Sequence, residues 1–215
     1  METIVLDHPL VDHKISLLRS RETPSATFRA LVSELSAFLV YEATKNLRVE
    51  NAEIATPVAT TTGKILMKNP RPLIVTIPRA GLGMLGEFQR MMPSAEVGFL
   101  GMARNEETLQ PEIYMDKIPR DLTGRQIYAI DPMLATGGSM LATLAELTDR
   151  GATDITVSDI IAAPEGVDAL KTFAKANPDV SLRLVVAALD EKLNERGYIV
   201  PGLGDAGDRL YGKID

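Results

Sequence analysis

The amino-acid sequence predicts an α/β fold: a mostly parallel sheet flanked by helices, with a small β-hairpin or hood excursion outside it. Two observations predict this class. From Pro72 onward, short apolar runs alternate with helical patterns, and buried strands separated by helices form parallel sheets covered on both faces. Before that point, Val49 to Leu66 is rich in Thr and Val, has no helical period, and contains Pro57 and Gly63.

Length and composition restrict the kind of protein. The 215 residues are expected to form a single domain, 1–215. With 23 Lys and Arg against 29 Asp and Glu, the net charge is −6, which argues against avid binding to nucleic acid. The chain has no Cys, which excludes disulfides, thiolate zinc sites and a cysteine nucleophile. Its longest apolar run, Leu184 to Leu189, is too short to cross a membrane. We therefore expect a cytoplasmic protein with a small-molecule partner.

The first regular element predicted is an amphipathic helix over Thr27 to Leu47. Phe28 and Leu39 belong to an apolar stripe with spacings of three and four, and Thr23-Pro24-Ser25 supplies a helix start. The next stretch, Val49 to Leu66, is interpreted as a hairpin outside the main sheet or as a plain surface excursion. The sequence leaves both interpretations open.

The remaining elements alternate along the chain. Apolar runs predict buried strands at Leu73 to Ile77, Val97 to Met102, Ile127 to Ile130, Ile155 to Ala162 and Leu182 to Leu189. Helices are predicted between them at Leu82 to Met92, Ser139 to Arg150 and Val167 to Ala176. Gly151 and Asn177-Pro178 are typical helix stops. The proline-containing run Gln110 to Pro119 predicts an extended, mobile excursion.

Ligands of such sheets bind beyond the C-terminal ends of the strands, so the loops there carry the candidate chemistry. Gly81-Leu82-Gly83-Met84-Leu85-Gly86 follows a predicted strand and opens a helix, as a dinucleotide-binding fingerprint does. However, Pro78-Arg79-Ala80 intervenes before the first glycine, and the position of the ribose-binding acid, about 20 residues on, falls in Ala103-Arg104-Asn105-Glu106. A nicotinamide-type oxidoreductase stays open on this motif, and so does close packing of helix against strand.

A second loop is a stronger candidate. The strand at Ile127 to Ile130 ends in Asp131-Pro132-Met133-Leu134-Ala135-Thr136-Gly137-Gly138-Ser139, and an amphipathic helix starts immediately. A small-residue loop at a helix N-terminus presents free backbone N–H groups and the positive end of the helix dipole, which together bind phosphate. Thr136 and Ser139 add hydroxyl donors, and Asp131 is placed to accept hydrogen bonds from sugar hydroxyls. The pattern predicts a phosphorylated-sugar site; the alternative is that Asp131 only caps the turn.

The Asp131 to Ser139 segment resembles the phosphoribosyl-diphosphate motif of type I phosphoribosyltransferases, in the form used by uracil phosphoribosyltransferases. Three further segments are similar to the same family: Arg79-Ala80-Gly81-Leu82-Gly83, Arg104-Asn105-Glu106-Glu107-Thr108, and Gly197-Tyr198-Ile199-Val200-Pro201-Gly202-Leu203-Gly204-Asp205-Ala206-Gly207-Asp208-Arg209. The last is the most specific, because most other phosphoribosyltransferases lack it. The similarity extends over nearly the whole chain and implies a type I phosphoribosyltransferase-like fold.

The resemblance implies a pyrimidine salvage enzyme that transfers the phosphoribosyl group of 5-phosphoribosyl 1-diphosphate to uracil, giving UMP and pyrophosphate. It implies catalytic roles for Asp131, Arg104 and Asp205. Binding of phosphoribosyl diphosphate is implied for Arg79, Arg104, Asp131, Pro132, Met133, Leu134, Ala135, Thr136, Gly137, Gly138, Ser139 and Asp205, and binding of uracil for Ile199, Gly204, Asp205 and Ala206. Magnesium (Mg²⁺) is expected to be carried on the diphosphate, so no dedicated metal residue is assigned.

Three further expectations follow from comparison with this family. Pro78 stands where most relatives have Leu; because proline lowers the cost of a cis bond before it, the sequence suggests that Pro78 stabilises an unusual peptide geometry in this loop. Relatives are dimers or tetramers and some are activated by GTP, so we expect a homo-oligomer with GTP as a candidate activator. A regulatory RNA-binding protein on the same scaffold is the alternative from another class, but it would need a basic, aromatic-bearing face, and 5% of the residues are aromatic.

Overall fold

The computed structural model describes residues 1–104 and 111–213, and for residues 103, 104 and 111 it describes the backbone alone. Among these residues, eight strands form the main sheet, in the order β1-β10-β9-β7-β4-β5-β6 with β8 beside β9. The strands are β1 (Glu2–Val5), β4 (Leu73–Thr76), β5 (Glu96–Arg104), β6 (Pro111–Lys117), β7 (Gln126–Ile130), β8 (Met133–Leu134), β9 (Asp154–Ala162) and β10 (Ser181–Leu189). Neighbouring strands run parallel except β6, which is antiparallel to β5.

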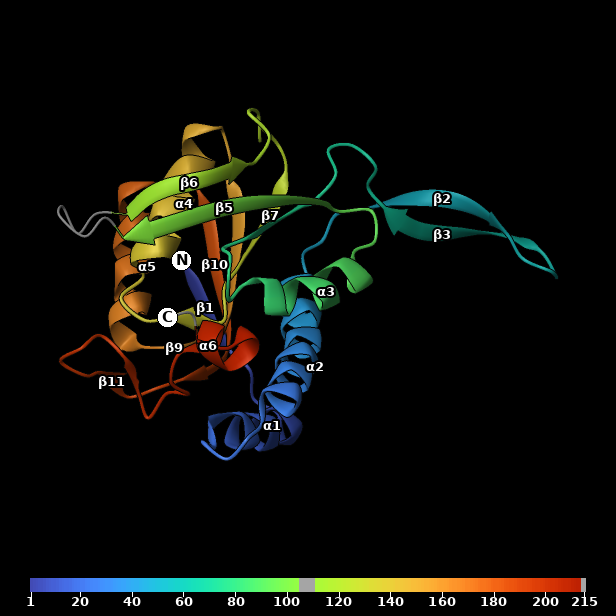
Figure 1. Ribbon diagram of the computed structural model, residues 1–215. Coiled ribbons are helices and arrows are strands. Elements are labelled where there is room, and N and C mark those ends of the chain that lie inside the picture. Colours follow the sequence, from blue (N-terminus) through green and yellow to red (C-terminus); the bar gives the residue numbers. More distant parts are fainter. Residues whose placement is uncertain (105–110, 214–215) are drawn as a thin grey trace.

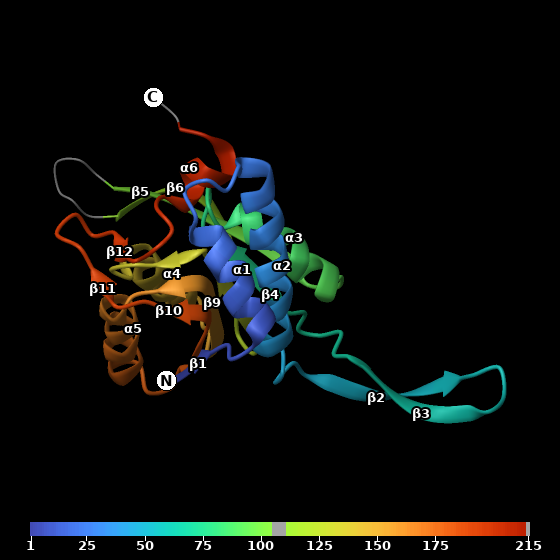
Figure 2. The same ribbon diagram turned by 90° about the horizontal axis from the view of Figure 1, so that it is seen from below.

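Helices cover both faces of this sheet (Figures 1 and 2). They are α1 (Pro9–Arg19), α2 (Ser25–Ala43), α3 (Leu82–Met91), α4 (Gly138–Asp149), α5 (Pro164–Ala176) and α6 (Ala206–Tyr211). One core joins α1, α2, α3 and α6 to the sheet through residues such as Phe28 and Leu210. A second core joins α4 and α5 to the other face through residues such as Leu144 and Leu170. Strands β4 and β7 are buried along their whole length because both faces are covered.

The residues between α2 and β4 form a hairpin that stands apart from this layered body. Strands β2 (Val49–Ala55) and β3 (Thr60–Leu66) pair antiparallel in a two-stranded sheet of their own. The hairpin, which we call the arm, projects away from the main sheet in both ribbon views (Figures 1 and 2). Of the two interpretations that the sequence left open for this stretch, the hairpin is confirmed.

The fold class is confirmed as predicted, and the structure differs in detail. Strand β1 and helix α1 were not predicted. The prediction of an extended, mobile excursion is wrong in part. Pro111–Lys117 is extended, but it pairs with β5 as the edge strand β6. The Tyr114 ring packs over Gly101 of β5, where a Cβ would lie 2.6 Å from the ring. No helix in the described ranges is both long and apolar enough to cross a membrane.

Candidate active site

The topology brings three loops to one edge of the sheet. Strands β4, β7 and β10 run parallel to their neighbours, so their C-terminal ends lie at the same edge. The loop after β4 contains Arg79, the loop after β7 contains Asp131 to Ser139, and the segment after β10 contains Asp205. These are three of the four segments that the sequence analysis selected. The fourth begins at Arg104, the last residue of β5; its side chain and residues 105–110, including Glu106, lie outside the described residues.

The loop after β7 leads directly into the start of α4. Gly137 is the N-cap residue of α4 in a left-handed conformation (φ 82°), and no side chain caps the helix. Gly138 N donates to Thr136 Oγ1 at 3.4 Å, and the next N–H groups at the start of the helix are available to a ligand. Thr136 and Ser139 are exposed and can add hydroxyl donors. The short strand β8 fixes the preceding residues, because Met133 and Leu134 pair with β9.

Gly166, in the first turn of α5, supports this loop from behind, and the sequence analysis did not select it. A Cβ on Gly166 would lie 2.5 Å from the carbonyl oxygen of Ala135 and 2.9 Å from the Leu134 side chain. The absence of a side chain therefore lets α5 pack directly against the phosphate loop. A glycine two residues after Pro164 and directly before the helix predicted at Val167 to Ala176 is the sequence signal that could have identified it.

Asp131 and Asp205 are electrostatically coupled across the edge. Burial, and secondarily the negative charge of Asp205, raise the pKa of Asp131 to about 8. Asp205 is itself exposed and is the N-cap residue of α6, where its carboxylate accepts a hydrogen bond from Asp208 N at 2.8 Å. The structure thus brings the predicted sugar carboxylate close to the C-terminal loop. Among the hydrogen bonds of the described residues, none caps the turn with the Asp131 side chain.

Arg79 joins the loop after β4 to the same C-terminal segment. Its Nη2 lies 3.4 Å from a carboxylate oxygen of Asp208, and a Cβ on Gly207 would lie 3.5 Å from that Nη2. The guanidinium is exposed at the edge rather than pointed into a core. An unusual peptide geometry is present in this loop, but not at the bond before Pro78 that a proline would favour. The cis peptide is the following bond, between Pro78 and Arg79.

The glycines after β4 serve helix packing. A Cβ on Gly81 would lie 2.5 Å from Thr76 Oγ1 and 2.8 Å from the carbonyl oxygen of Ile130. A Cβ on Gly83 would meet Leu210 of α6 at 2.9 Å. Both glycines therefore allow α3 to sit against the strand ends and α6, which is the second interpretation of the formal dinucleotide fingerprint.

The C-terminal segment forms a loop in which buried and exposed residues alternate in short groups. It runs through the hairpin of β11 (Lys192–Leu193) and β12 (Ile199–Val200), then through a cis Val200–Pro201 bond. Gly202 (φ 64°) and Gly204 (φ 84°) adopt left-handed conformations, and a Cβ on Gly202 would collide with the Ile199 carbonyl. Of the four residues predicted to bind uracil, Ile199 and Ala206 are buried, whereas Gly204 and Asp205 are exposed.

Two arginines and a buried carboxylate hold this loop. The sequence analysis did not select Arg19 or Asp190, and it quoted Arg209 only as the end of the C-terminal segment. Asp190 is 7% exposed, forms an ion pair with Arg19, and accepts a hydrogen bond from Gly202 N at 2.8 Å. Arg19 also donates to the Gly202 carbonyl at 2.9 Å. Arg209 donates to the carbonyls of Leu18, Ser20 and Leu203, and its guanidinium carbon lies 4.3 Å from the centre of the Phe28 ring. Because most of these polar partners lie far apart in the sequence, no local sequence pattern predicts their contacts.

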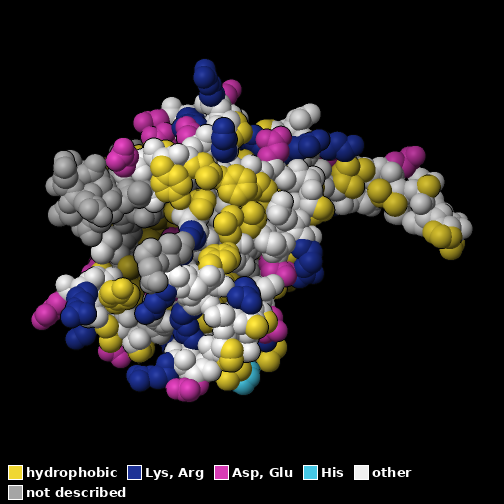
Figure 3. Space-filling view, viewed as in Figure 1, with side chains coloured by type: hydrophobic (Ala, Val, Ile, Leu, Met, Phe, Trp, Pro, Cys, Tyr) yellow, Lys and Arg dark blue, Asp and Glu magenta, His cyan; other side chains and the backbone are white. Residues whose placement is uncertain are grey.

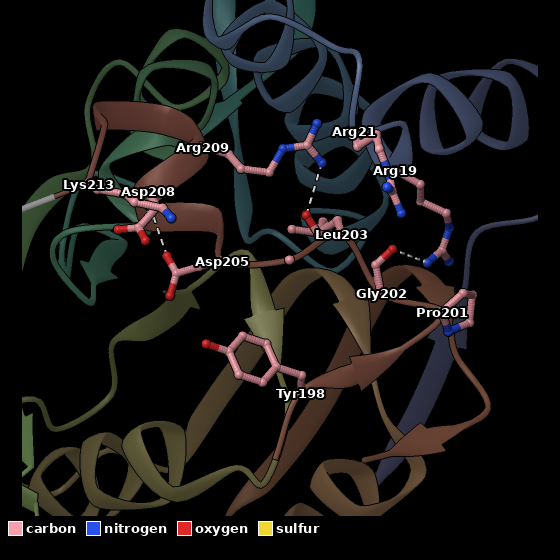
Figure 4. Close-up of a pocket in the computed structure, with 11 residues that line it drawn as sticks. Arg19, Arg21, Tyr198, Pro201, Gly202, Leu203, Asp205, Asp208, Arg209 and Lys213 are labelled. Carbon is pink, nitrogen blue, oxygen red and sulfur yellow. Dashed lines mark hydrogen bonds between the residues drawn. The ribbon is translucent and has the colours of Figure 1, made fainter. Parts of the chain in front are cut away.

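Figure 4 shows the pocket that these residues line. Arg19, Arg21 and Arg209 lie on one side of the loop, and Tyr198 lies on the other. The dashed hydrogen bonds from Arg19 to Gly202 and from Arg209 to Leu203 join α1 and α6 to the loop (Figure 4). The C-terminal loop is therefore a rigidly supported stretch of main chain beside the Asp131 carboxylate.

Comparisons with known proteins agree with this geometry. A family model described as "Uracil phosphoribosyltransferase" matches residues 5–213. The uracil phosphoribosyltransferase of Nocardioides sp. is 58% identical over 214 residues, and that of Streptomyces coelicolor 55% over 215 residues, each covering 100% of both chains. Among solved structures, the AQ2163 protein of Aquifex aeolicus superposes with a TM-score of 0.86 at 39% identity, covering 98% of each chain.

A more distant structure shares the fold alone. The hypoxanthine-guanine phosphoribosyltransferase of Bacillus anthracis has a TM-score of 0.50 and 8% identity, covering 77% of this chain and 80% of that one. Its similarity places the layered sheet among phosphoribosyltransferase folds. The match of the family model over nearly the whole length and the identities above 50% are the stronger findings. On this evidence, the chain belongs to the uracil phosphoribosyltransferase family.

Proposed function

We propose that the chain transfers the phosphoribosyl group of 5-phosphoribosyl 1-diphosphate to uracil, giving UMP and pyrophosphate in pyrimidine salvage. One observation carries this function: the loops after β4, β7 and β10 meet at one sheet edge, with Arg79 beside Asp208 and Asp131 coupled to Asp205. The loop after β7, Arg79 and the C-terminal loop lie at this one edge. We match them to the ribose phosphate, the diphosphate and the base, respectively. The chain is an enzyme, a pentosyltransferase.

The phosphoribosyl half is assigned to the loop after β7. The free N–H groups at the start of α4, with the residues Ala135 to Ser139, bind the 5-phosphate. The Asp131 carboxylate accepts hydrogen bonds from the ribose hydroxyls, with Pro132, Met133 and Leu134 forming the backbone that places it. A carboxylate is suited to this role because its two oxygens can accept several hydrogen bonds at once.

The diphosphate half is assigned to Arg79 and Arg104, whose planar guanidinium groups can form paired hydrogen bonds with phosphate oxygens. Magnesium enters with the substrate, since Mg²⁺ binds diphosphate oxygens and retains waters. Within residues 1–104 and 111–213, no group of three or more His, Cys, Asp or Glu side chains is placed to hold a metal ion. Because Mg²⁺ retains much of its hydration, we assign the ligands of the ion to the diphosphate and to water, where it would neutralise the charge of the leaving group.

Uracil is assigned to the main chain around Ile199 and Gly204-Asp205-Ala206. A backbone N–H facing O4 and a carbonyl facing N3–H accept uracil, while cytosine presents the opposite polarity. A wrong base would leave buried polar groups unpaired, which is costly. The support of this loop by Arg19, Asp190 and Arg209 keeps its donors and acceptors in place before the base arrives.

The chain lowers the barrier by positioning and electrostatics. As the bond between ribose C1 and the diphosphate oxygen breaks, C1 gains oxocarbenium character and the base nitrogen approaches it. Asp131 and Asp205 provide negative charge near the ribose, and Arg79 and Arg104 stabilise the departing diphosphate. No protein group needs to form a covalent bond in this scheme.

A base panel tests the function directly. Uracil, cytosine, thymine, hypoxanthine and orotate are each assayed with phosphoribosyl diphosphate and Mg²⁺, and nucleotide and pyrophosphate are quantified. UMP formed from uracil, with little product from the other bases, is the expected result. A thermal-shift comparison of NAD with phosphoribosyl diphosphate separates this function from the oxidoreductase alternative. Stabilisation by NAD alone, with no UMP formed, would reject the proposal.

Four finer expectations belong to the same proposal. We propose that residues 1–215 act as one domain and that the enzyme is a homo-oligomer. The arm supports an oligomer because it exposes Val58 at 95% outside the main body. GTP activation is predicted from the family resemblance, and it is tested by assaying UMP formation with and without GTP. The cytoplasmic location expected from the sequence stays a prediction.

A further inference from the structure

Asp159, in β9, is a buried acid that the reaction described above does not use. Its residue is 0% exposed, and neither carboxyl oxygen has a hydrogen-bond partner among the described residues. An ionised carboxylate without partners in such a place would be very costly. Burial, and then the negative charge of Asp131, raise the pKa of Asp159 well above its ordinary value. Burial and the charge of Asp131 therefore both favour the neutral carboxylic acid form of Asp159.

The strand register places Asp159 opposite Asp131. Ile130 of β7 pairs with Ser158 of β9, and the ladder continues for one more residue, since Asp131 N donates to the Ser158 carbonyl at 3.3 Å. Adjacent strands lie about 4.8 Å apart, and side chains alternate between the faces. Asp131 and Asp159 therefore stand side by side on the sheet face that α4 and α5 cover, where Ala129 and Val157 precede them.

The other charged groups around Asp159 are engaged or remote. Glu165 of α5 is exposed and accepts a hydrogen bond from Leu193 N, and Asp190, beyond β10, is paired with Arg19. The remaining charged residues of the covering helices are exposed or lie in the last turns of α4: Glu146, Asp149, Asp168, Lys171 and Lys175. The negative charge of Asp205 raises the pKa of Asp131. Asp131 is thus the charged neighbour that matters for Asp159.

We propose that Asp159 is a positioning residue: when Asp131 is ionised, the neutral Asp159 carboxyl donates a hydrogen bond to it and holds it toward the ribose hydroxyls. This inference rests on the proposed role of Asp131 in binding ribose. A neutral carboxyl is a donor, and a hydrogen bond to the charged form of an acid favours that form. The two acids then carry a single negative charge between them. The Asp159 carboxyl occupies the side of the Asp131 carboxylate that is turned away from the ligand.

The test compares two substitutions of Asp159. Asp159→Asn keeps an N–H donor of the same size without a second acid, whereas Asp159→Val removes the donor and suits a buried strand. For each protein, kcat/KM for phosphoribosyl diphosphate is measured from pH 6 to 9.5 at saturating uracil, and thermal unfolding is recorded. Ser158→Ala is the matched control, because Ser158 is an equally buried hydroxyl without a partner on the opposite face of the same strand.

In the wild-type enzyme, kcat/KM should rise with pH to a plateau as Asp131 ionises near its pKa of about 8. Asp159→Val should move that rise about one unit higher, so that kcat/KM at pH 7 falls about tenfold and recovers above pH 9. Asp159→Asn and Ser158→Ala should keep the wild-type profile. Below pH 8, where Asp131 is mostly neutral, Asp159→Val should also fold with an unchanged or higher unfolding temperature, because a buried polar group has left the core.

An unshifted pH profile in a folded Asp159→Val enzyme would reduce Asp159 to a structural residue and overturn the inference while leaving the proposed function intact. A shift in Asp159→Asn equal to that in Asp159→Val would also overturn it, because the donor would then be irrelevant. Failure of the wild-type enzyme to form UMP would reject the proposed function itself, so the two failures are distinguishable.

Discussion

Asp131 is held in a place that does not suit its charge. In its proposed role, Asp131 accepts hydrogen bonds from ribose hydroxyls most strongly when it is ionised, yet burial and Asp205 raise its pKa from an ordinary 3.8 to about 8. Between these two pH values the folded chain binds a proton that the unfolded chain releases. The free energy of unfolding therefore falls as pH rises from about 4 to about 8. Such opposition between stability and charge is typical of functional sites.

At the same residue, replacing Asp131 with Asn should separate activity from stability. The amide cannot ionise, so UMP formation should fall by about two orders of magnitude or more, because a charged acceptor at the ribose is lost. The unfolding temperature at pH 8 to 9 should rise, because the cost of burying the charge is removed. Turnover assays and thermal melts at pH 5, 7 and 9 check both parts, with Asp168→Asn, an exposed acid of α5 paired with Lys171, as a control for simple loss of a charge. Wild-type turnover in Asp131→Asn would refute the assignment of Asp131 to the ribose.

At the scale of elements, the sequence predicts what depends on local pattern. The strands that begin near Leu73, Ile127, Ile155 and Leu182 are mostly apolar, so most of their burial follows from composition. The loop after β7 is predictable too, because its small residues stand between a strand and a helix. Strand β6 is missed because Pro111 begins it and its side chains are exposed; edge strands tolerate proline, and their pairing depends on a partner elsewhere in the chain.

The site shows the same division. Arg79, Asp131 and Asp205 can be found because each lies in a recognisable segment. The ion pair of Arg19 with Asp190 joins residues 171 positions apart, and nothing local in the sequence connects them. Asp159 also escapes notice, because one acid within an apolar strand carries no pattern. Tertiary pairing, rather than periodicity, determines these contacts.

Helix α5 provides a prediction at this scale through Gly166. Gly166→Ala would place a methyl group 2.5 Å from the Ala135 carbonyl, so the phosphate loop or α5 must move. We expect KM for phosphoribosyl diphosphate to rise about tenfold and the protein to lose about 1 to 3 kcal/mol of stability. Gly86→Ala in α3 is the matched control, since a Cβ there meets nothing within 4 Å and alanine favours a helix by about 1 kcal/mol. Equal kinetics in both variants would show that the contact of α5 with the loop has no functional role.

The contact between α1 and the C-terminal loop provides a second prediction at this scale. Arg19→Met would leave the buried Asp190 carboxylate without its ion pair, which costs about 3 to 5 kcal/mol when a buried pair is broken. Because Arg19 also holds the Gly202 carbonyl, KM for uracil should rise more than KM for phosphoribosyl diphosphate. Lys171→Met is the control, since its ion pair with Asp168 is exposed and such pairs contribute little. A Michaelis–Menten analysis of both substrates decides the matter; equal changes in the two KM values would contradict a role specific to the base loop.

At the scale of the whole molecule, the surface is uneven. The acidic chain carries mixed charges over most of the face in Figure 3, whereas apolar side chains gather over β5 and β6 and recur along the arm. Exposed Ile113, Tyr114 and Met115 of β6 contribute to the first group, and Ile54 and Val58 to the second. An edge strand and a protruding hairpin with apolar side chains are features that a protein normally covers.

The arm yields the prediction that belongs to the whole molecule. An isolated two-stranded hairpin is marginally stable in water, so we expect an arm of this length to gain order from a second copy of the chain. Replacing residues 53–62 with Asn-Gly would join Ala52 to Gly63, which are already partners in the ladder, through a favourable two-residue turn. Light scattering during size-exclusion chromatography should give a multiple of the 23.3 kDa chain mass for the intact protein and a smaller assembly for the shortened one. Glu53→Gln, which keeps the arm, should behave as the intact protein. A monomeric intact protein would reject the oligomer, and an undiminished assembly after shortening would show that the contact lies elsewhere, with the apolar face of β6 as the next surface to change.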